Sequence, residues 1–338
     1  MSKTVSLLLV GCATCLLLAI AAVAVATGAA MAPADRVELK LGHSLDQNHP
    51  VHLAMEFMKE RLAEKSSGTM ILEIRPNGQL GAETECLSLV QRGVLAMTKT
   101  SAAPLENFVP EMAVFGIPFL FEDEAHFWRV LHSDLGNDLL EAGADSGLRG
   151  LSYYDAGARS FYTISRPIMT PEDLKGLLIR VQESPTSIAM IESLGGSPTP
   201  VDFGDLYTAL QQGVVDGAEN NPPSFYTNRH YEVCKHLSLD QHTRTPDVLI
   251  ISQRWWQRLT PQQQQWLAEA AQESAEYERK LWQEKTQEAL AGAEERGVTI
   301  HHPDLEPFRQ SVSSMVESYA GTPTGDLIEK IQAMGGEQ

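Results

Sequence analysis

Residues 37–97 alternate between short apolar runs and segments with helical spacing, and this order restricts the fold more than any other feature of the chain. Val37, Leu39 and Leu41 alternate with polar residues, as in a strand with one buried face. We expect strands at 37–41, 70–74 and 94–97, and helices at 51–62 and 80–92. A β-α-β-α-β order favours a mainly parallel sheet with helices on both faces, so the sequence predicts an α/β fold.

The second half of the chain adds further strands and then a very long helix. Thr260 and Pro261 form a helix-start signature, and a helix from about 262 to 296 follows. At ~1.5 Å per residue this helix would be about 50 Å long, which exceeds one small domain. It could therefore brace two lobes, and 338 residues suffice for two domains.

The first 32 residues are expected to be a secretory signal peptide rather than part of the fold. Lys3 is the only charged residue before Asp35, residues 5–26 are almost wholly apolar, and small residues follow at 24–32. The apolar run is long enough to span a membrane, so an uncleaved anchor is the alternative. Residues 9–12 resemble a lipoprotein cleavage box, but most of the apolar run lies after them.

The charge balance excludes some partners. The formal net charge is −18, so nucleic acid and anionic membrane surfaces are poor partners. The same charge would repel an anionic ligand. A site for an organic acid must therefore supply its own local positive charge, which makes individual arginines informative.

Cysteine use leaves one question open. Cys12 and Cys15 lie in the expected signal, so Cys86 and Cys234 remain. In an oxidising compartment these two could form a disulfide, or both could be buried thiols.

Leu174–Val181 is a short apolar run that contains Arg180 near its end. A run of this kind beside glycine is typical of a buried strand, and its carboxyl end lies where a crevice can form in an α/β sheet. A guanidinium is always charged and donates two parallel hydrogen bonds to a carboxylate. We predict that Arg180 binds the carboxylate of a small organic acid; the alternative is a structural ion pair with Glu183 or Asp202.

Four weaker candidates each have a structural alternative. Arg159 could face the same anion or could satisfy a buried carboxylate. Glu83 could accept a ligand hydroxyl, or it could only favour the dipole at a helix start. Phe203 could stack on a ligand or pack in the core. Asn220 could bind the ligand with its amide or could belong to a turn before two prolines.

Catalytic and metal-binding patterns are weak. His49, His52 and Asp46 have loose spacing for a metal site, and no second cluster supports them. The sequence contains no Gly-x-Ser-x-Gly nucleophile turn, no phosphate-binding glycine loop and no dinucleotide fingerprint. We therefore expect no catalytic residue, no metal and no cofactor.

Seven segments spread over most of the chain carry a family likeness. They are Leu39–His43, Pro76–Gly81, Ala113–Phe119, Leu174–Val181, Gly195–Pro200, Tyr207–Asn220 and His302–Leu305. In this order they resemble the DctP family, the solute-binding proteins of the tripartite ATP-independent (TRAP) transporters. The resemblance implies a periplasmic monomer that is a receptor rather than an enzyme.

The resemblance also implies a two-lobed periplasmic binding protein fold, with hinge strands and a long helix that spans both lobes. The expected boundaries are 1–32 for the signal peptide, 33–157 plus 246–285 for the first lobe, and 158–245 plus 286–338 for the second lobe.

Residues of this chain match the ligand contacts of that family. Arg180 would fix the ligand carboxylate, with Arg159 as a second arginine and Asn220 as the site asparagine. Phe203 would pack on the ligand. Glu83, His43 and Ser44 would contact hydroxyls from the first lobe. Ser101 and His242 match the crevice wall.

The choice of ligand follows from the first lobe. A dicarboxylate would need a second cation opposite Arg180, whereas the first-lobe residues suit hydroxyl groups. We therefore expect a sugar acid such as glucuronate or galacturonate, delivered to TRAP permease subunits. The alternative ligand is a C4-dicarboxylate or another small hydroxy or keto acid. The sequence does not show where the Lys99 side chain points, and a Lys99 that faced the ligand could reverse the preference for a sugar acid. A secreted enzyme acting on acid sugars and a sensing module of a membrane receptor are the rival classes.

Overall fold

The computed structural model describes residues 36–336. The expected signal peptide, residues 1–32, lies outside this range. Within the described part of the chain, no helix is both long enough and apolar enough to cross a membrane.

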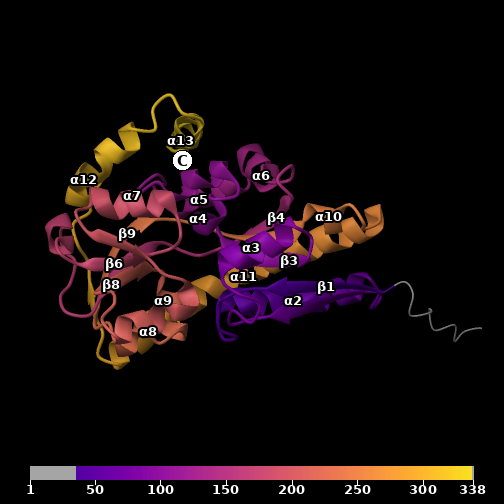
Figure 1. Ribbon diagram of the computed structural model, residues 1–338, viewed down its shortest axis with the longest axis horizontal. Coiled ribbons are helices and arrows are strands. Elements are labelled where there is room, and N and C mark those ends of the chain that lie inside the picture. Colours follow the sequence, from indigo (N-terminus) through magenta and orange to yellow (C-terminus); the bar gives the residue numbers. More distant parts are fainter. Residues whose placement is uncertain (1–35, 337–338) are drawn as a thin grey trace, which may run out of the picture. The chain divides into compact units, whose positions relative to one another are not determined.

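The first sheet has five strands in the order β2-β1-β3-β10-β4 (Figure 1). Its strands are β1 (Val37–Gly42), β2 (Met70–Arg75), β3 (Met97–Ser101), β4 (Leu148–Tyr154) and β10 (Asp247–Ser252). Strands β1 and β3 pair in parallel, as the sequence predicts. Strand β10 runs antiparallel to both β3 and β4, because it enters this sheet from the second lobe. The sheet is therefore mixed rather than mainly parallel.

Helices cover the first sheet, and several of them start at residues with capping side chains. They are α2 (Pro50–Lys65), α3 (Glu83–Gln91), α4 (Ala102–Leu105), η2 (Pro110–Gly116), α5 (Glu124–Leu131), α6 (Asp134–Glu141) and α10 (Gln253–Trp256). Helix α2 begins at Pro50, and the His49 side chain accepts a hydrogen bond from the backbone N–H of Val51. Between α5 and α6, Ser133 accepts from the N–H of Gly136 and starts a new helix.

The second sheet has six strands in the order β11-β9-β5-β8-β6-β7. Its strands are β5 (Arg159–Thr163), β6 (Leu178–Val181), β7 (Ser197–Pro200), β8 (Gly217–Asn220), β9 (His236–Thr243) and β11 (Thr299–His301). Strand β6 pairs in parallel with both β7 and β8, while β5 is antiparallel to β8 and β9. The surrounding helices are η3 (Pro171–Leu174), α7 (Pro185–Ser193), η4 (Phe203–Asp205), α8 (Leu206–Gln211), α9 (Pro222–Thr227), η5 (His230–Glu232) and α12 (Glu306–Glu317).

Two strand-to-strand crossings join the sheets. One leads from β4 to β5 and the other from β9 to β10, and they lie side by side: Tyr154 is opposite Asp247, and Arg159 is opposite Thr243. These are the hinge strands of a two-lobed fold.

The long helix α11 (Pro261–Glu295) connects the two lobes at the back. It packs on α2 and β4 of the first lobe and on α9 of the second (Figure 1). Thr260 and Gln263 form its capping box. At Gly292 a side chain would not fit, because a Cβ atom would lie 2.6 Å from the hydroxyl oxygen of Tyr226.

The last helix, α13 (Pro323–Ala333), packs in the core of the first lobe. Ile328 and Ile331 join the cluster that includes Phe127 and Val130, and the ring of His126 hydrogen-bonds to the carbonyl oxygen of Ile331 at 2.9 Å. This packing differs from the expectation that residues 286–338 all belong to the second lobe. The chain crosses back after α12, which packs on α7.

The two cysteines of the described chain are both buried free thiols. Cys86 lies in the first-lobe core and Cys234 in a core cluster of the second lobe. Burial raises the pKa of Cys86 to about 11.

A carboxyl group is buried where α11 passes the hinge. Glu278 is 0% exposed, and its Oε2 accepts a hydrogen bond from the backbone N–H of Asp155 at 2.8 Å. Its Oε1 has no partner among the described residues. Burial raises the pKa of Glu278 well above 4.5, and the neighbouring Asp155 adds to the effect. Folding therefore favours the protonated form of this side chain.

Replacing Glu278 by Gln tests this proton. A carboxyl whose pKa rises on folding favours the folded state at low pH and loses that advantage as the pH rises. We expect the free energy of unfolding of the wild type to fall, relative to Glu278→Gln, as the pH rises from the unfolded pKa of this carboxyl to its folded pKa, by about 1.4 kcal/mol per pH unit within that window. Urea denaturation across this pH range measures the difference. The control is Glu276→Gln, an exposed site on the same helix; equal pH profiles for Glu278→Gln and wild type would contradict the assignment.

Candidate functional site

Arg180 lies on a central strand of the second sheet. Strand β6 places it opposite Thr199 of β7 and Ala218 of β8. Neighbouring residues of a strand point to opposite faces, and Ile179 points into the lobe core. The Arg180 side chain therefore leaves the other face of the strand, toward the cavity between the lobes.

The Arg180 guanidinium is buried without a protein carboxylate. The residue is 2% exposed, and its Nε donates to the carbonyl oxygen of Val201 at 2.8 Å. Among the described residues, its Nη1 has no hydrogen-bond partner, and no carboxylate lies within 4.0 Å of the guanidinium. Burial lowers the pKa of Arg180. Neither Glu183 nor Asp202 forms the structural ion pair that was the alternative.

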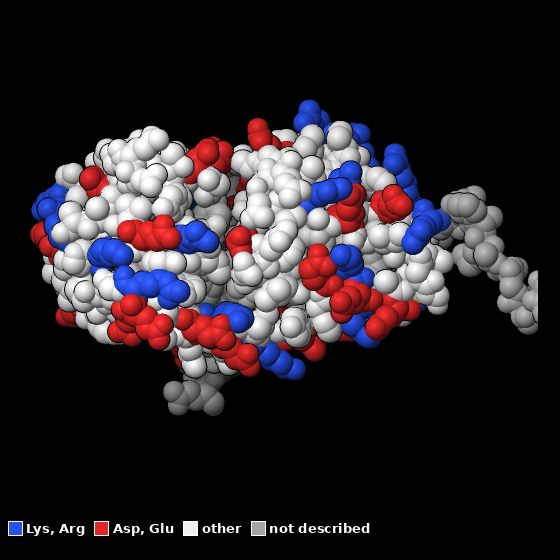
Figure 2. Space-filling model, turned by 90° about the horizontal axis from the view of Figure 1, so that it is seen from below, with Lys and Arg blue, Asp and Glu red and all other residues white. Residues whose placement is uncertain are grey.

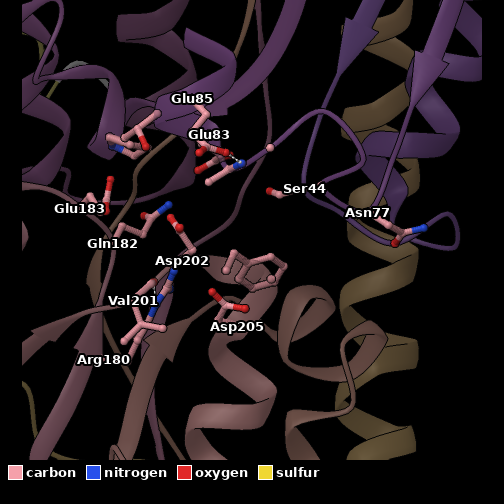
Figure 3. Close-up of a pocket in the computed structure, with 17 residues that line it drawn as sticks. Ser44, Asn77, Glu83, Glu85, Arg180, Gln182, Glu183, Val201, Asp202 and Asp205 are labelled. Atoms are coloured by element: carbon pink, nitrogen blue, oxygen red, sulfur yellow. Dashed lines mark hydrogen bonds between the residues drawn. The ribbon is translucent and has the colours of Figure 1, made fainter. Parts of the chain in front are cut away.

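The cavity between the lobes has a volume of about 380 Å³. Figure 3 shows Ser44, Glu83 and Glu85 on one side of it and Arg180 and Asp202 on the other. A small adjoining cavity of about 30 Å³ shares Ser44, Glu83, Gln182 and Phe203 with it and adds Lys99, Ser101, Arg159 and Asn220. Residues from both lobes therefore face one space.

Two atoms lining this space lack protein partners. One is Nη1 of Arg180, and the other is the hydroxyl oxygen of Ser44, which is buried without a hydrogen bond in the described structure. Buried polar groups are nearly always paired, because an unpaired one costs about 1–3 kcal/mol. An oxygen-rich ligand between the lobes would satisfy both groups. The ring of Phe203 lies beside them, with its centroid 5.9 Å from the guanidinium carbon of Arg180.

Lys99 is neutralised by two acids of the first lobe. Its Nζ lies 2.9 Å from Asp247 and 3.2 Å from Glu83. Burial opposes its charge, but Asp247 and Glu83 outweigh burial and raise the pKa of Lys99. The Oε1 of Glu83 also accepts from the N–H of Ser101 at 3.2 Å. The first lobe therefore presents a carboxylate and hydroxyl groups to the cavity rather than a free cation.

Arg159 differs from Arg180 because it has its own carboxylate. It makes a two-point ion pair with Glu219, whose Oε1 lies 2.8 Å from Nη2, and Nη2 also donates to the carbonyl oxygen of Glu219. Nη1 donates to the Oδ1 of Asn220 at 2.8 Å. These bonds use four of the five guanidinium N–H groups, so one N–H of Nη1 remains for the small cavity.

Glu219 is the centre of a buried charge network. Its Oε2 lies 3.4 Å from Nε2 of His242, whose Nδ1 lies 2.7 Å from Asp240. Burial would raise the pKa of Glu219, but Arg159 and His242 lower it to about 2. Burial would lower the pKa of His242, but Asp240 and Glu219 raise it to about 9. The four groups are therefore two cations and two anions that neutralise each other.

Two of the predicted residues, His43 and His242, line neither cavity. The Nε2 of His43 lies 3.0 Å from Nδ1 of His52, and its Nδ1 accepts from the N–H of Leu45 at 3.1 Å. His242 lies behind Glu219. Both histidines support the residues of the cavity wall instead of facing the space.

Gln182 is a wall residue that the sequence analysis missed. It lines both cavities, and its Oε1 accepts from the hydroxyl of Ser101 at 3.3 Å across the cleft. The signal was present in the sequence, because residues two apart on an extended chain point the same way. Gln182 follows Arg180 by two residues.

The face of the molecule seen in Figure 2 has no basic patch that would attract a polyanion. Lys and Arg side chains there are interspersed with Asp and Glu and form no continuous basic patch. This face therefore offers no continuous basic surface for a polyanion.

Two α/β lobes joined by crossing strands, with an unpaired guanidinium facing the cavity between them, define a two-lobed solute-binding protein. The chain belongs to family 7 of the bacterial extracellular solute-binding proteins, the DctP family, whose model matches residues 41–322. Members of this family are receptors and not enzymes, so the receptor class expected from the sequence is confirmed and the secreted-enzyme alternative is set aside.

Similar proteins of known structure or curated function bind sugar acids. A TRAP solute-binding protein from Xanthobacter autotrophicus Py2, solved with β-D-galacturonate, is 36% identical, with a TM-score of 0.85 over 87% of this chain and 99% of that chain. One from Roseobacter denitrificans, solved with β-D-glucuronate, is 35% identical, with a TM-score of 0.85 over 88% and 99%. The 2,3-diketo-L-gulonate-binding periplasmic protein of Escherichia coli K12 is 32% identical over 82% of this chain and 85% of its own.

Replacing Glu219 by Gln tests the charge network. The variant leaves Arg159 and His242 buried with one fewer anion, and breaking a buried ion pair of this kind costs about 3–5 kcal/mol. We expect the free energy of unfolding in urea to fall by that amount at neutral pH. The control, Glu172→Gln on η3, removes an exposed acid that makes no side-chain hydrogen bond in the described structure. An equal loss in both variants would show that the network does not stabilise the fold.

Proposed function

We propose that this protein is the periplasmic receptor of a TRAP transporter and that it captures a hexuronate, D-glucuronate or D-galacturonate. It works as a monomer that releases the acid to the membrane permease subunits. The buried, unpaired guanidinium of Arg180 in the cavity between the lobes carries this proposal, because only an anionic ligand would compensate its charge. The family and the sugar acids bound by its relatives support it.

The carboxylate of the ligand pairs with Arg180. The free N–H of Arg159 and the amide of Asn220 meet the same end of the ligand from the small cavity. Phe203 packs against the sugar ring, as aromatic rings do with apolar ring faces. In this assignment His43 and His242 act from behind the wall.

The sugar hydroxyls meet the first lobe. Glu83 accepts hydrogen bonds from them, and Ser44 and Ser101 exchange hydrogen bonds with them. Because Lys99 is already neutralised by Asp247 and Glu83, the first lobe offers no second cationic anchor, and a C4-dicarboxylate fits less well than a uronate. The polar wall thus supports a ligand with one carboxylate and several hydroxyl groups.

Closure of the two lobes completes the site. The first lobe, residues 33–157 plus 246–285, closes on the second, residues 158–245 plus most of 286–338, about the crossings at 154–159 and 243–247. Excluding water lowers the local dielectric constant and strengthens the pair between Arg180 and the ligand carboxylate. The signal peptide at 1–32 directs the protein to the periplasm, where the permease recognises the closed form.

Arg180→Met separates a binding role from a structural one. Methionine keeps much of the side-chain volume and removes an unpaired buried charge, which is often neutral or stabilising. We expect the melting temperature without ligand to be unchanged or higher, and affinity for D-galacturonate and D-glucuronate to fall at least about 30-fold by calorimetry. The control is Arg309→Met, an exposed arginine over the ring of Phe119. Wild-type affinity in Arg180→Met would refute the carboxylate assignment.

Glu83→Gln tests the ligand class. The change replaces one of the two acceptor oxygens by an NH2 donor, and it removes one of the two acids that neutralise Lys99. A thermal-shift screen of uronates, aldonates and dicarboxylates reads the outcome, since a bound ligand raises the melting temperature. We expect uronates to raise the melting temperature of the wild type. The variant should lose about tenfold in uronate affinity. Its affinity for dicarboxylates, relative to that for uronates, should increase. Glu85→Gln is the control, because Glu85 lines the same cavity but caps helix α3. If only dicarboxylates raise the melting temperature of the wild type, the assignment of a hexuronate ligand is wrong.

A further inference from the structure

A second cavity lies on the first lobe, away from the cleft, where α5, α6, β4 and α11 meet. Its volume is about 800 Å³. The floor is apolar and consists of Trp128, Leu131, Leu140 and Tyr153, all of them buried. The rim is polar and comes mainly from α11. No residue of this groove lines the cleft cavities.

Two hydrogen-bond donors line the groove without an acceptor. The guanidinium of Arg279 lies over Trp128, with its carbon 4.5 Å from the ring centroid, and it has no carboxylate within 4.0 Å and no hydrogen bond among the described residues. The Nε1 of Trp128 is buried and likewise has no partner in the described structure. Trp128 is 4% exposed, and a buried donor of this kind usually has an acceptor.

The same combination occurs in the cleft. There, Arg180 lies over Phe203 and both line the cavity. In the groove, Arg279 lies over Trp128 and both line the cavity. The walls differ: the cleft has carboxylate and hydroxyl groups opposite the arginine, whereas the groove has aliphatic and aromatic side chains. The two sites should therefore prefer different acids.

We propose that this groove binds an organic monocarboxylate with an apolar body, either aromatic or medium-chain aliphatic. Arg279 and the indole N–H of Trp128 donate to the carboxylate oxygens. The hydrocarbon part lies on Leu131, Leu140 and Tyr153, which removes apolar surface from water. Glu276 and Lys280 also line the groove, and their opposite charges offset each other.

Calorimetry with phenylacetate and octanoate tests the proposal, on the complete protein with and without D-galacturonate. We expect saturable binding under both conditions, because the groove and the cleft share no residue. Arg279→Gln should weaken binding at least about tenfold, since hydrogen bonds to a charged group are lost. Trp128→Phe, which keeps a ring and loses the N–H, should also weaken it, and phenylacetamide should bind more weakly than phenylacetate.

The matched control is Arg258→Gln. Arg258 also lies over an indole, with its guanidinium carbon 5.7 Å from the Trp255 ring centroid, but it does not line the groove. This variant should bind both acids like the wild type. The proposal is overturned if neither acid binds saturably, if phenylacetamide binds as well as phenylacetate, if Arg279→Gln has no effect, or if the groove binds an apolar peptide and neither acid. None of these outcomes bears on the uronate assignment, which the Arg180 variant tests separately.

Discussion

Burying a guanidinium removes its hydration, which costs several kcal/mol unless other groups replace the water. The two cleft arginines meet this constraint in different ways. Arg159 has Glu219, Asn220 and a backbone carbonyl around it, whereas Arg180 has one carbonyl, that of Val201. The first arginine is part of the protein's own charge balance. The second is left with an uncompensated charge at the surface of a cavity, and this imbalance is the physical basis for proposing an organic anion as the ligand.

The paired charges lie where the two lobes meet. Lys99 and Asp247 join neighbouring strands next to one crossing, and Arg159, Glu219 and His242 join three strands next to the other. Each set of charges is neutral or nearly neutral. Charged groups can therefore be buried at the hinge without the large cost in stability of an uncompensated charge. The same neutrality leaves the field of Arg180 as the main local attraction for an anion, in a chain whose net charge is −18.

The sequence predicts features that depend on local periodicity and misses those that depend on register. The Arg180 strand, the start of α11 at Thr260 and Pro261, and the parallel pairing of β1 with β3 follow from spacing and capping. The partner of Arg159 does not, because it requires β5 to pair antiparallel with β8 so that Ser160 lies opposite Asn220. The direction of Lys99 likewise depends on β10, which enters the sheet from 148 residues further along the chain. The return of α13 to the first lobe is set by packing of Ile328 and Ile331, and any amphipathic helix could offer similar residues to either lobe.

The unpaired arginine also explains why ligand binding and closure would be coupled. Closing the lobes without an anion would remove water from Arg180 and return only the hydrogen bond to Val201, so the charge opposes closure. With a ligand carboxylate bound, the charge of Arg180 would favour closure instead of opposing it. The ion pair becomes stronger as water leaves and the dielectric constant falls. Arg159 cannot act in this way, since Glu219 compensates it in either state. In the proposed mechanism, a single uncompensated cation would therefore be sufficient to make closure depend on the ligand, and the paired charges around it would keep the hinge stable.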